Sequence, residues 1–334
     1  MVNLIKIETL YIMTNIPSDI EIAKRVESYF TSMINVNITN SEYAIWNPMV
    51  NSTNNLYEKG ILTEELIKFG DSIITTGVNI HDYKPDPQHI IDFHQNYHEN
   101  QLIELTNIPL ESLLIYKNFN IKGKTYKNNK KLCTPVTAYR LAYYVHKSIE
   151  HLDKNKRNIV LEIGGGFGLT SLIFNRNMKN SCYIIIDIPT TGILSAYFLI
   201  KMGLNVCLYG EYNTEDYEDL INKYDVIIIH PYEIEKFKEN SIDIVINTAS
   251  LVEMNDLWIQ YYIKNISRIT KRFYNDNHFI TEGREPLDRY CNEYLSNFNI
   301  IYKQITPINY LYPPILKITH EIPFEEVLRI KKDN

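Results

Sequence analysis

Cysteine is scarce in this chain, which has only four in 334 residues: Cys133, Cys182, Cys207 and Cys291. They lie far apart and form no Cys-x-x-Cys pair, so a disulfide framework is not expected. Two of them sit within apolar runs, where a free cysteine commonly packs as a small hydrophobic side chain. The sequence therefore predicts a reducing, cytoplasmic setting.

Long apolar runs and an excess of positive charge are also missing. No segment approaches about eighteen uninterrupted apolar residues, so no membrane span is predicted. The start of the chain shows no basic end followed by an apolar stretch and a small-residue cleavage site, so no secretory signal is expected. A formal net charge of −6 argues against a nucleic-acid partner, which would need a basic face toward the phosphates. The acidic balance fits a small or neutral substrate.

Glycine is uncommon as well, and its concentration at one place therefore stands out. Four of the twelve glycines lie between positions 164 and 168, directly after the apolar run Val160-Leu161-Glu162-Ile163. Glycine loses more conformational freedom on folding than other residues, so such a cluster usually marks a place where a side chain would collide with something. We expect a nucleotide-like cofactor to approach the backbone there.

The two parts of the chain differ in their hydrophobic periodicity. Residues 1 to 130 predict a mainly helical region, whose clearest helix follows Ser18, a suitable N-cap, with apolar residues three and four apart. From Asn158 onward, short β-rich runs alternate with helices, which is typical of a parallel sheet covered on both faces. We predict an α/β fold over residues 131–334, and we assign residues 1–130 to substrate selection or oligomerisation.

The individual elements follow from the same patterns. Strands are predicted at 159–163, 183–188, 225–230, 242–247 and 271–274, and helices at 168–177, 190–203, 214–223 and 254–270. Residues 206–209 could be the third strand instead, with 225–230 as an added one. Two late β-rich runs, 300–305 and 315–322, could close the sheet as an antiparallel pair. Residues 122–131 predict a surface linker, after which Thr134 and Pro135 predict the start of a helix.

The glycine cluster predicts a ligand site. A strand that ends in glycines and leads into a helix points backbone amides at a ligand, which suits phosphate or a carboxylate equally well. The dinucleotide fingerprint started at Gly164 would need a small residue where Leu169 stands, and no P-loop lysine follows. The next predicted strand ends at Asp187, a carboxylate that can accept both hydroxyls of a ribose or can cap the following helix.

These residues carry a resemblance to a known superfamily. The pattern Glu162-x-Gly164-x-Gly166-x-Gly168, followed by Asp187-Ile188-Pro189, resembles motif I and the ribose-binding acid of class I S-adenosylmethionine-dependent methyltransferases. Residues 195–199, 243–254 and 273–277 are similar, more narrowly, to the sugar O-methyltransferase family. The resemblance covers about residues 130 to 280. It implies a Rossmann-like methyltransferase domain, S-adenosylmethionine as cofactor, and a sugar or glycosylated small molecule as the acceptor.

The resemblance also implies a role for each matching position. Glu162 would organise the glycine loop, and the glycines would let the backbone pass the methionine part of the cofactor. Asp187 would take the ribose and Ile188 would line the adenine, with the loop after the third strand at the adenine edge. Asn247 and Thr248 would border the transferring methyl group. The implied cofactor-binding residues are Glu162, Gly164, Gly165, Gly166, Gly168, Asp187, Ile188, Pro231, Asn247 and Thr248.

An acceptor hydroxyl is a poor nucleophile, so a general base near the tip of the fourth strand would assist the transfer. Glu253 is the first candidate because it follows the loop at 247–250 and opens the next predicted helix, where the helix dipole would also stabilise a carboxylate. His230 is the second, since an imidazole titrates near neutral pH, although a lone histidine at a strand end is more often structural.

Other interpretations stay open. His94 and His98 lie four apart on a predicted helix, like half of a metal site, but no third ligand can be named, so no metal is predicted. The rival functions are a methyltransferase of a non-sugar metabolite, an NAD-dependent reductase, and a cofactor-binding module without turnover. The sequence leaves open whether the chain forms a homo-oligomer.

Overall fold

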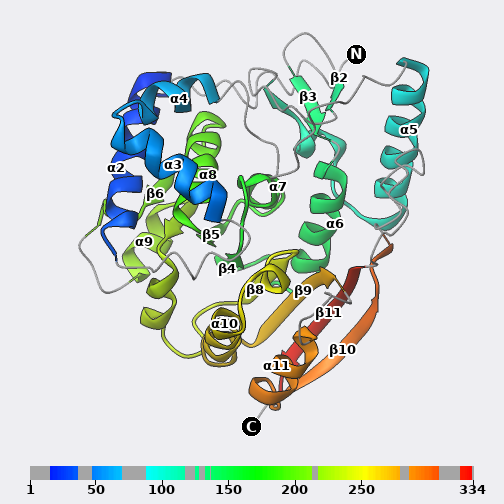
Figure 1. Ribbon diagram of the computed structural model, residues 1–334. Helices are drawn as coiled ribbons and strands as arrows, with labels where there is room; N and C mark the ends of the chain where they lie inside the picture. The colour runs from blue at the N-terminus through cyan, green and yellow to red at the C-terminus, as the bar shows by residue number, and fades with distance from the viewer. Residues whose placement is uncertain are drawn as a thin grey trace.

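A central eight-stranded sheet organises the computed structural model, which describes residues 16–36, 47–69, 88–116, 125–127, 132–135, 137–212, 217–278, 286–307 and 324–332 (Figure 1). The strands follow the spatial order β6-β7-β5-β4-β8-β9-β11-β10. Their bounds are β4 (Asn158–Ile163), β5 (Ser181–Ile186), β6 (Val206–Leu208), β7 (Val226–Ile229), β8 (Ile244–Thr248), β9 (Arg272–His278), β10 (Phe298–Ile305) and β11 (Phe324–Lys331). The predicted α/β, Rossmann-like class is confirmed.

The direction of the strands locates the place where a ligand can bind. The six strands from β6 to β9 are parallel, and β11 is antiparallel to both β9 and β10. In chain order, the first strand of this sheet is the central strand β4. The next strand, β5, pairs with one side of β4, and the later strand β8 pairs with its other side. Ligands of open α/β sheets bind at the carboxyl ends of the strands where the strand order reverses. Here that point lies between β4 and β8.

The open question about the third strand is resolved by the pairing. Both candidate segments are strands, and β7 pairs with β5 from Tyr183↔Val226 to Ile186↔Ile229. The shorter β6 pairs with the outer side of β7 and forms the edge of the sheet. Four successive buried β-branched residues suit a strand that is covered on both faces, so Val226–Ile229 takes the inner position.

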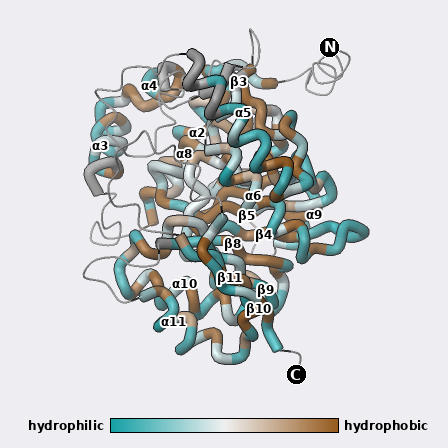
Figure 2. The backbone as a smooth tube through the Cα atoms, turned by 90° about the vertical axis from the view of Figure 1, so that its right-hand side faces the viewer, coloured by the Kyte–Doolittle hydropathy of each residue, from teal (hydrophilic) through white to brown (hydrophobic). Residues whose placement is uncertain are grey.

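Helices cover both faces of this sheet. On one face lie α6 (Thr137–Ile149), α7 (Leu169–Asn177) and α8 (Pro189–Lys201), and on the other α9 (Glu218–Lys223), α10 (Asp256–Ile269) and α11 (Leu287–Tyr294). Successive strand residues divide between the two cores: Val160 packs with the first group and Leu161 with the second. Apolar segments follow the central strands in Figure 2, and polar segments follow many outer turns. Among the described helices, none is both long enough and apolar enough to cross a membrane.

The N-terminal region is mainly helical, as predicted, and also holds a small antiparallel sheet. Its elements are α2 (Asp19–Ile34), α3 (Asn47–Glu58), α4 (Leu62–Phe69), α5 (Gln88–Leu105), η3 (Leu110–Leu113), β1 (Ile115–Tyr116), β2 (Thr125–Lys127) and β3 (Leu132–Pro135). Helices α2 and α3 contact α8, α4 contacts α2 and α3, and α5 lies beside α6 (Figure 1). Ser18 caps α2 as predicted, and its amide donates to Glu21 at 2.8 Å.

Three element predictions need correction. Thr125–Lys127, within the predicted linker, is strand β2, and Thr134 and Pro135 belong to β3, so that α6 begins at Thr137. Both β1 and β2 pair with β3, and these hydrogen bonds override the local capping pattern. The third helix after the glycine loop begins only at Glu218. An antiparallel pair does close the sheet, with β11 beside β10, whereas the predicted run at 315–322 lies outside the described residues.

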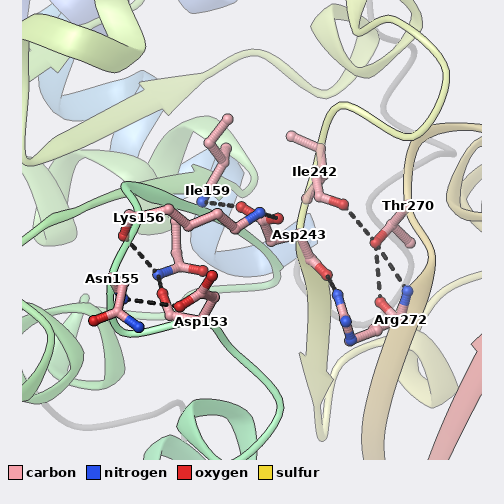
Figure 3. Close-up of polar contacts among 9 residues, drawn as sticks. Asp153, Asn155, Lys156, Ile159, Ile242, Asp243, Thr270 and Arg272 are labelled. Atoms are coloured by element: carbon pink, nitrogen blue, oxygen red, sulfur yellow. Dashed lines mark hydrogen bonds and ion pairs between the residues drawn. The ribbon is translucent and has the colours of Figure 1, made fainter.

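The amino ends of the central strands are held by polar contacts far from the predicted site (Figure 3). The Asp243 carboxylate, just before β8, accepts a hydrogen bond from the Ile159 amide of β4 at 2.8 Å and pairs with Lys156 at 2.5 Å. The Thr270 hydroxyl accepts from the Arg272 amide at the start of β9 at 3.1 Å. These contacts fix the register at one end of the sheet and leave the carboxyl ends to a ligand.

Replacing Gly168 with Ala should destabilise the fold more than replacing Gly60 with Ala. Both glycines have positive φ, +88° and +68°, but a Cβ on Gly168 would lie 2.9 Å from Leu199 of α8, whereas one on Gly60 would have no atom within 4 Å. We expect a loss of about 1–2 kcal/mol for Gly60→Ala from backbone strain, and roughly 1–3 kcal/mol more for Gly168→Ala from overpacking. Urea denaturation measures both, and equal losses would contradict a tight α7–α8 contact.

Candidate functional site

The loop between β4 and α7 depends on glycine for its conformation. Gly164, Gly166 and Gly168 have φ values of +76°, +57° and +88°, in the left-handed region that other residues rarely adopt. The Gly164 amide donates to the carbonyl of Ile186, at the end of β5, at 2.8 Å. The loop is therefore a built turn at the carboxyl end of β4 that is bonded to the neighbouring strand.

The glycines of this loop face different surroundings. A Cβ on Gly164 would lie 2.2 Å from the Ser250 hydroxyl, and one on Gly165 would lie 2.7 Å from Ile185. These two positions are required by packing within the protein. A Cβ on Gly166 would meet no atom within 4 Å. Gly166 is therefore the position at which the backbone faces open space, and a ligand can approach there without meeting a side chain.

Asp187 joins the glycine loop to the end of β5. Its Oδ2 accepts a hydrogen bond from the Gly166 amide at 2.8 Å, and its Oδ1 accepts one from the Ile188 amide at 2.7 Å. Burial raises the pKa of this carboxyl to about 7, although both amides act to lower it. Ile188 is half-buried and is the N-cap residue directly before α8. Asp187 thus supports the start of that helix and still presents a half-buried carboxylate at the sheet edge.

Glu162 lies beneath the glycine loop. Its side chain is 1% exposed, and its carboxylate accepts a hydrogen bond from the Tyr183 hydroxyl at 3.0 Å. A Cβ on Gly165 would come within 3.2 Å of the same carboxylate. Burial raises the pKa of Glu162 to about 8 against the opposing hydrogen bonds from Tyr183 and Thr170. This position fits a residue that supports the loop from below.

Asn247 ties three strand ends together. Its side-chain amide donates to the Ile163 carbonyl of β4 at 2.8 Å, and its side-chain oxygen accepts from Nδ2 of Asn277, in β9, at 2.9 Å. The Ser250 hydroxyl donates to the same Ile163 carbonyl at 2.9 Å. Thr248, the next residue of β8, is half-buried. The sequence had indicated no role for Ser250 and Asn277, although both follow the polar ends of predicted strands.

Glu253 lies near this group but not where the sequence placed it. It ends the short η5 turn (Leu251–Glu253), and α10 begins only at Asp256, because the Asn255 side chain caps that helix by accepting from the Trp258 amide at 3.0 Å. Glu253 therefore does not open the helix. Its negative charge raises the pKa of Asp187, so the two carboxylates lie within electrostatic range of each other.

His230 follows β7 directly and is buried among aromatic side chains. Its Nδ1 accepts a hydrogen bond from the Tyr232 amide at 3.2 Å, and its ring centroid lies 5.5 Å from that of Tyr209 and 5.2 Å from that of Tyr232. Burial lowers the pKa of this imidazole to about 4. The neutral ring therefore carries its proton on Nε2, an arrangement that favours donation over proton uptake. Pro231 follows, buried, as the first residue of η4 (Pro231–Lys236).

Asp276 is a residue that sequence reasoning missed. It lies in β9 directly opposite Thr248 and is fully buried. Its Oδ1 accepts from the Thr306 hydroxyl at 2.6 Å, and the Tyr144 hydroxyl is a second hydrogen-bonding neighbour of this carboxyl. Burial raises the pKa of this carboxyl to about 6. The signal in the sequence was the run Asn275-Asp276-Asn277, three polar residues that end a β-rich segment.

Of the histidine pair of the N-terminal region, His94 and His98, the structure describes the side chain of His98 alone. His98 is buried, with its ring centroid 5.5 Å from that of Tyr139, while the side chain of His94 lies outside the described structure. Over the part of the chain that the structure describes, no three His, Cys, Asp or Glu side chains gather as metal ligands.

Comparison with known proteins gives distant similarities, and no family profile matches the chain. Over 179 residues it is 22% identical to release factor glutamine methyltransferase of Flavobacterium psychrophilum, covering 52% of this chain and 62% of that protein. The chain thus spans about three fifths of that relative's length.

Similar solved structures include magnesium protoporphyrin IX methyltransferase (ChlM) of Synechocystis PCC 6803 with bound SAM, which is 12% identical to this chain. That match covers 59% of this chain and 80% of the ChlM chain, with a TM-score of 0.37. The YcgJ protein of Bacillus subtilis matches at 16% identity, 58% and 98% coverage, and a TM-score of 0.38. Scores of this size do not identify a common fold, so the fold assignment rests on the strand order itself.

Replacing Glu162 with Gln should remove a pH dependence of stability. The pKa of about 8 in the folded protein exceeds the ordinary value of 4.5, so the buried neutral carboxyl stabilises the fold at low pH, and this stabilisation is lost as pH rises from about 4.5 through 8. Between about pH 5 and 8.5, the unfolding free energy of the wild type should fall by roughly 2–4 kcal/mol relative to Glu162→Gln. Urea titrations at several pH values measure this, and a pH-independent difference would contradict it.

Proposed function

We propose that this protein is an S-adenosylmethionine-dependent methyltransferase that methylates a hydroxyl group of a sugar or a glycosylated small molecule. One observation carries the proposal: at the switch point of the sheet, the glycine loop presents Gly166 toward open space and bonds through the Gly166 amide to Asp187. Sequence similarity to a release factor glutamine methyltransferase over half of the chain supports methyl-transfer chemistry.

The residues at the switch point fit this cofactor. Asp187 accepts hydrogen bonds from the Gly166 and Ile188 amides and from the Thr191 side chain. A carboxylate offers about four acceptor sites, so Asp187 can still accept a hydroxyl donor from a ribose. Gly166 leaves room for the ligand, Glu162 supports the loop, and Asn247 fixes the end of β8 beside it. When bound, the cofactor would supply a methyl group already activated by its sulfonium. The work left to the protein is to align the acceptor oxygen and to exclude water.

Glu253 is the better supported of the two base candidates. It is half-buried in the short η5 turn that follows the carboxyl end of β8. In the proposed step, Glu253 would take the proton of the acceptor hydroxyl as that oxygen receives the methyl group that the bound cofactor would supply. His230 already uses Nδ1 to accept an amide hydrogen, which leaves its Nε2–H as a donor for the cofactor's adenine side.

The acceptor class rests on the family resemblance and on one buried atom. Asn277 Oδ1, near the end of β9, has no hydrogen-bond partner among the described residues. It is an acceptor, and buried acceptors are nearly always paired in native proteins. The hydroxyl groups of a sugar are donors of the matching kind, which supports a polyhydroxylated acceptor over an apolar one.

The structure favours the methyltransferase over an NAD-dependent reductase. The dinucleotide fingerprint uses its third small residue for close packing between helix and strand. Here Leu169 stands at that position and is buried at the start of α7, while Gly168 makes the close contact with Leu199 of α8. The spacing of the loop therefore departs from the dinucleotide pattern.

Replacing Gly166 with Ala should impair cofactor binding more than stability. The added methyl would enter the open space without meeting the protein, so the unfolding free energy should fall by about 1–2 kcal/mol from backbone strain, as for Gly60→Ala. We expect affinity for S-adenosylhomocysteine, measured by titration calorimetry, to fall by at least about tenfold, whereas Gly60→Ala should bind like the wild type. Unchanged affinity in Gly166→Ala would place the ligand elsewhere.

Asp187→Ala and Glu253→Gln should separate cofactor binding from transfer. The first should weaken S-adenosylhomocysteine binding by about tenfold to a hundredfold, because it removes a charge-assisted acceptor. The second should spare binding and slow transfer of a labelled methyl group into a panel of sugars and nucleotide sugars by about a hundredfold. Loss of both properties in Glu253→Gln would remove Glu253 from the base role.

The same assays decide between the rival functions. Tight binding of NAD without response to S-adenosylhomocysteine would favour the reductase. Cofactor binding without transfer to any acceptor would favour a non-catalytic module, and transfer only to non-sugar alcohols would correct the substrate class.

A further inference from the structure

Helix α2 of the N-terminal region is fastened along α8 of the sheet domain. The Arg25 side chain donates to the Val206 carbonyl of β6 at 2.5 Å and to Glu211 at 2.7 Å. Lys201, at the end of α8, pairs with Asp19 at 3.1 Å. These contacts hold α2 along α8, which begins directly after Asp187 (Figure 1).

Tyr29 of α2 packs tightly against Gly192 of α8. A Cβ on Gly192 would lie 2.2 Å from the Tyr29 hydroxyl oxygen and 3.1 Å from the ring carbon that carries it. Glycine inside a helix is unfavourable by about 1 kcal/mol relative to alanine, so its presence in α8 is explained by this contact. Gly192 donates its amide to the Ile188 carbonyl, which places it one turn into α8. The Tyr29 hydroxyl therefore sits against the first turn of that helix.

This hydroxyl is buried without a partner. Tyr29 is 1% exposed, and its oxygen has no hydrogen bond to any described residue. The hydroxyl of Thr190, in the same first turn of α8, is also buried and unpaired over the described chain. Leaving a buried hydroxyl unpaired costs about 1–3 kcal/mol, and native proteins seldom do so. The charge of Asp187, together with burial, raises the pKa of Tyr29, so the two groups lie within electrostatic reach.

We propose that Tyr29 is a cofactor-binding residue whose hydroxyl donates a hydrogen bond to a ribose oxygen of S-adenosylmethionine. Asp187 accepts a hydrogen bond from a hydroxyl of the same ribose. The inference rests on the proposed function. A ribose hydroxyl can donate and accept at once, a carboxylate can only accept, and a phenol is a good donor, so the two side chains are complementary toward one diol. Helix α2 then forms one wall of the cofactor site, in addition to any part it has in selecting the acceptor.

The test is titration calorimetry of the full-length protein with S-adenosylhomocysteine. Tyr29→Phe keeps the ring and its packing and removes only the hydroxyl, so its Kd should rise by about fivefold to thirtyfold, the loss of one buried hydrogen bond. Tyr57→Phe is the matched control. The Tyr57 hydroxyl of α3 accepts a hydrogen bond from the Thr31 hydroxyl of α2 at 3.0 Å and has no part in the proposal. Its Kd should stay within about twofold of the wild type.

Two further variants keep the proposal open to contradiction. In the Asp187→Asn background, adding Tyr29→Phe should have a much smaller effect than in the wild type, because both residues act on the same diol. Gly192→Ala should displace the Tyr29 hydroxyl and weaken binding, and it should weaken binding far less in Tyr29→Phe, which lacks the oxygen that the new methyl group would meet.

The outcomes separate this inference from the proposed function. A wild type that binds no S-adenosylhomocysteine would overturn both. A wild type that binds it while Tyr29→Phe binds equally well would overturn only the role of Tyr29, and so would equal effects of Tyr29→Phe and Tyr57→Phe.

Discussion

The hydrogen bond between the Gly166 amide and the Asp187 carboxylate is the contact on which the site depends. It spans two neighbouring parallel strands and fixes the glycine loop relative to the start of α8. A side chain would restrict the loop at each of its glycines, by packing at Gly164 and Gly165 and by strain at Gly166. The site can form there because parallel strands bring their carboxyl ends to one edge, and the strand order reverses beside β4.

Buried carboxylates surround this edge of the sheet. Burial raises the pKa of Glu162 to about 8, of Asp187 to about 7 and of Asp276 to about 6, because each loses hydration that its hydrogen bonds only partly replace. A fold whose stability alone mattered would place neutral side chains here. A cationic ligand would favour the ionised forms, and this agrees with the sulfonium of the proposed cofactor.

The N-terminal region is part of this arrangement. Helix α2 belongs to the same hydrophobic core as α6, α7 and α8, and Arg25 bonds the carbonyl of the edge strand β6. Tyr29 reaches the first turn of α8 only because Gly192 has no side chain. The two regions that differ in sequence pattern therefore share one core, and the proposed cofactor wall draws on both.

The sequence by itself determined the features that depend on local pattern: the alternation of strands and helices after residue 158, the glycine turn, the acid after the second strand and the N-cap at Ser18. Each is set by neighbours a few residues away. Only the tertiary structure decided that Val226–Ile229 lies inside the sheet and that Thr134 and Pro135 belong to a strand, because strand pairing joins distant segments. It also decided the partners of the site, since Asn247 bonds Ile163 and Asn277, and Tyr29 meets Gly192, across separations that carry no periodic signal.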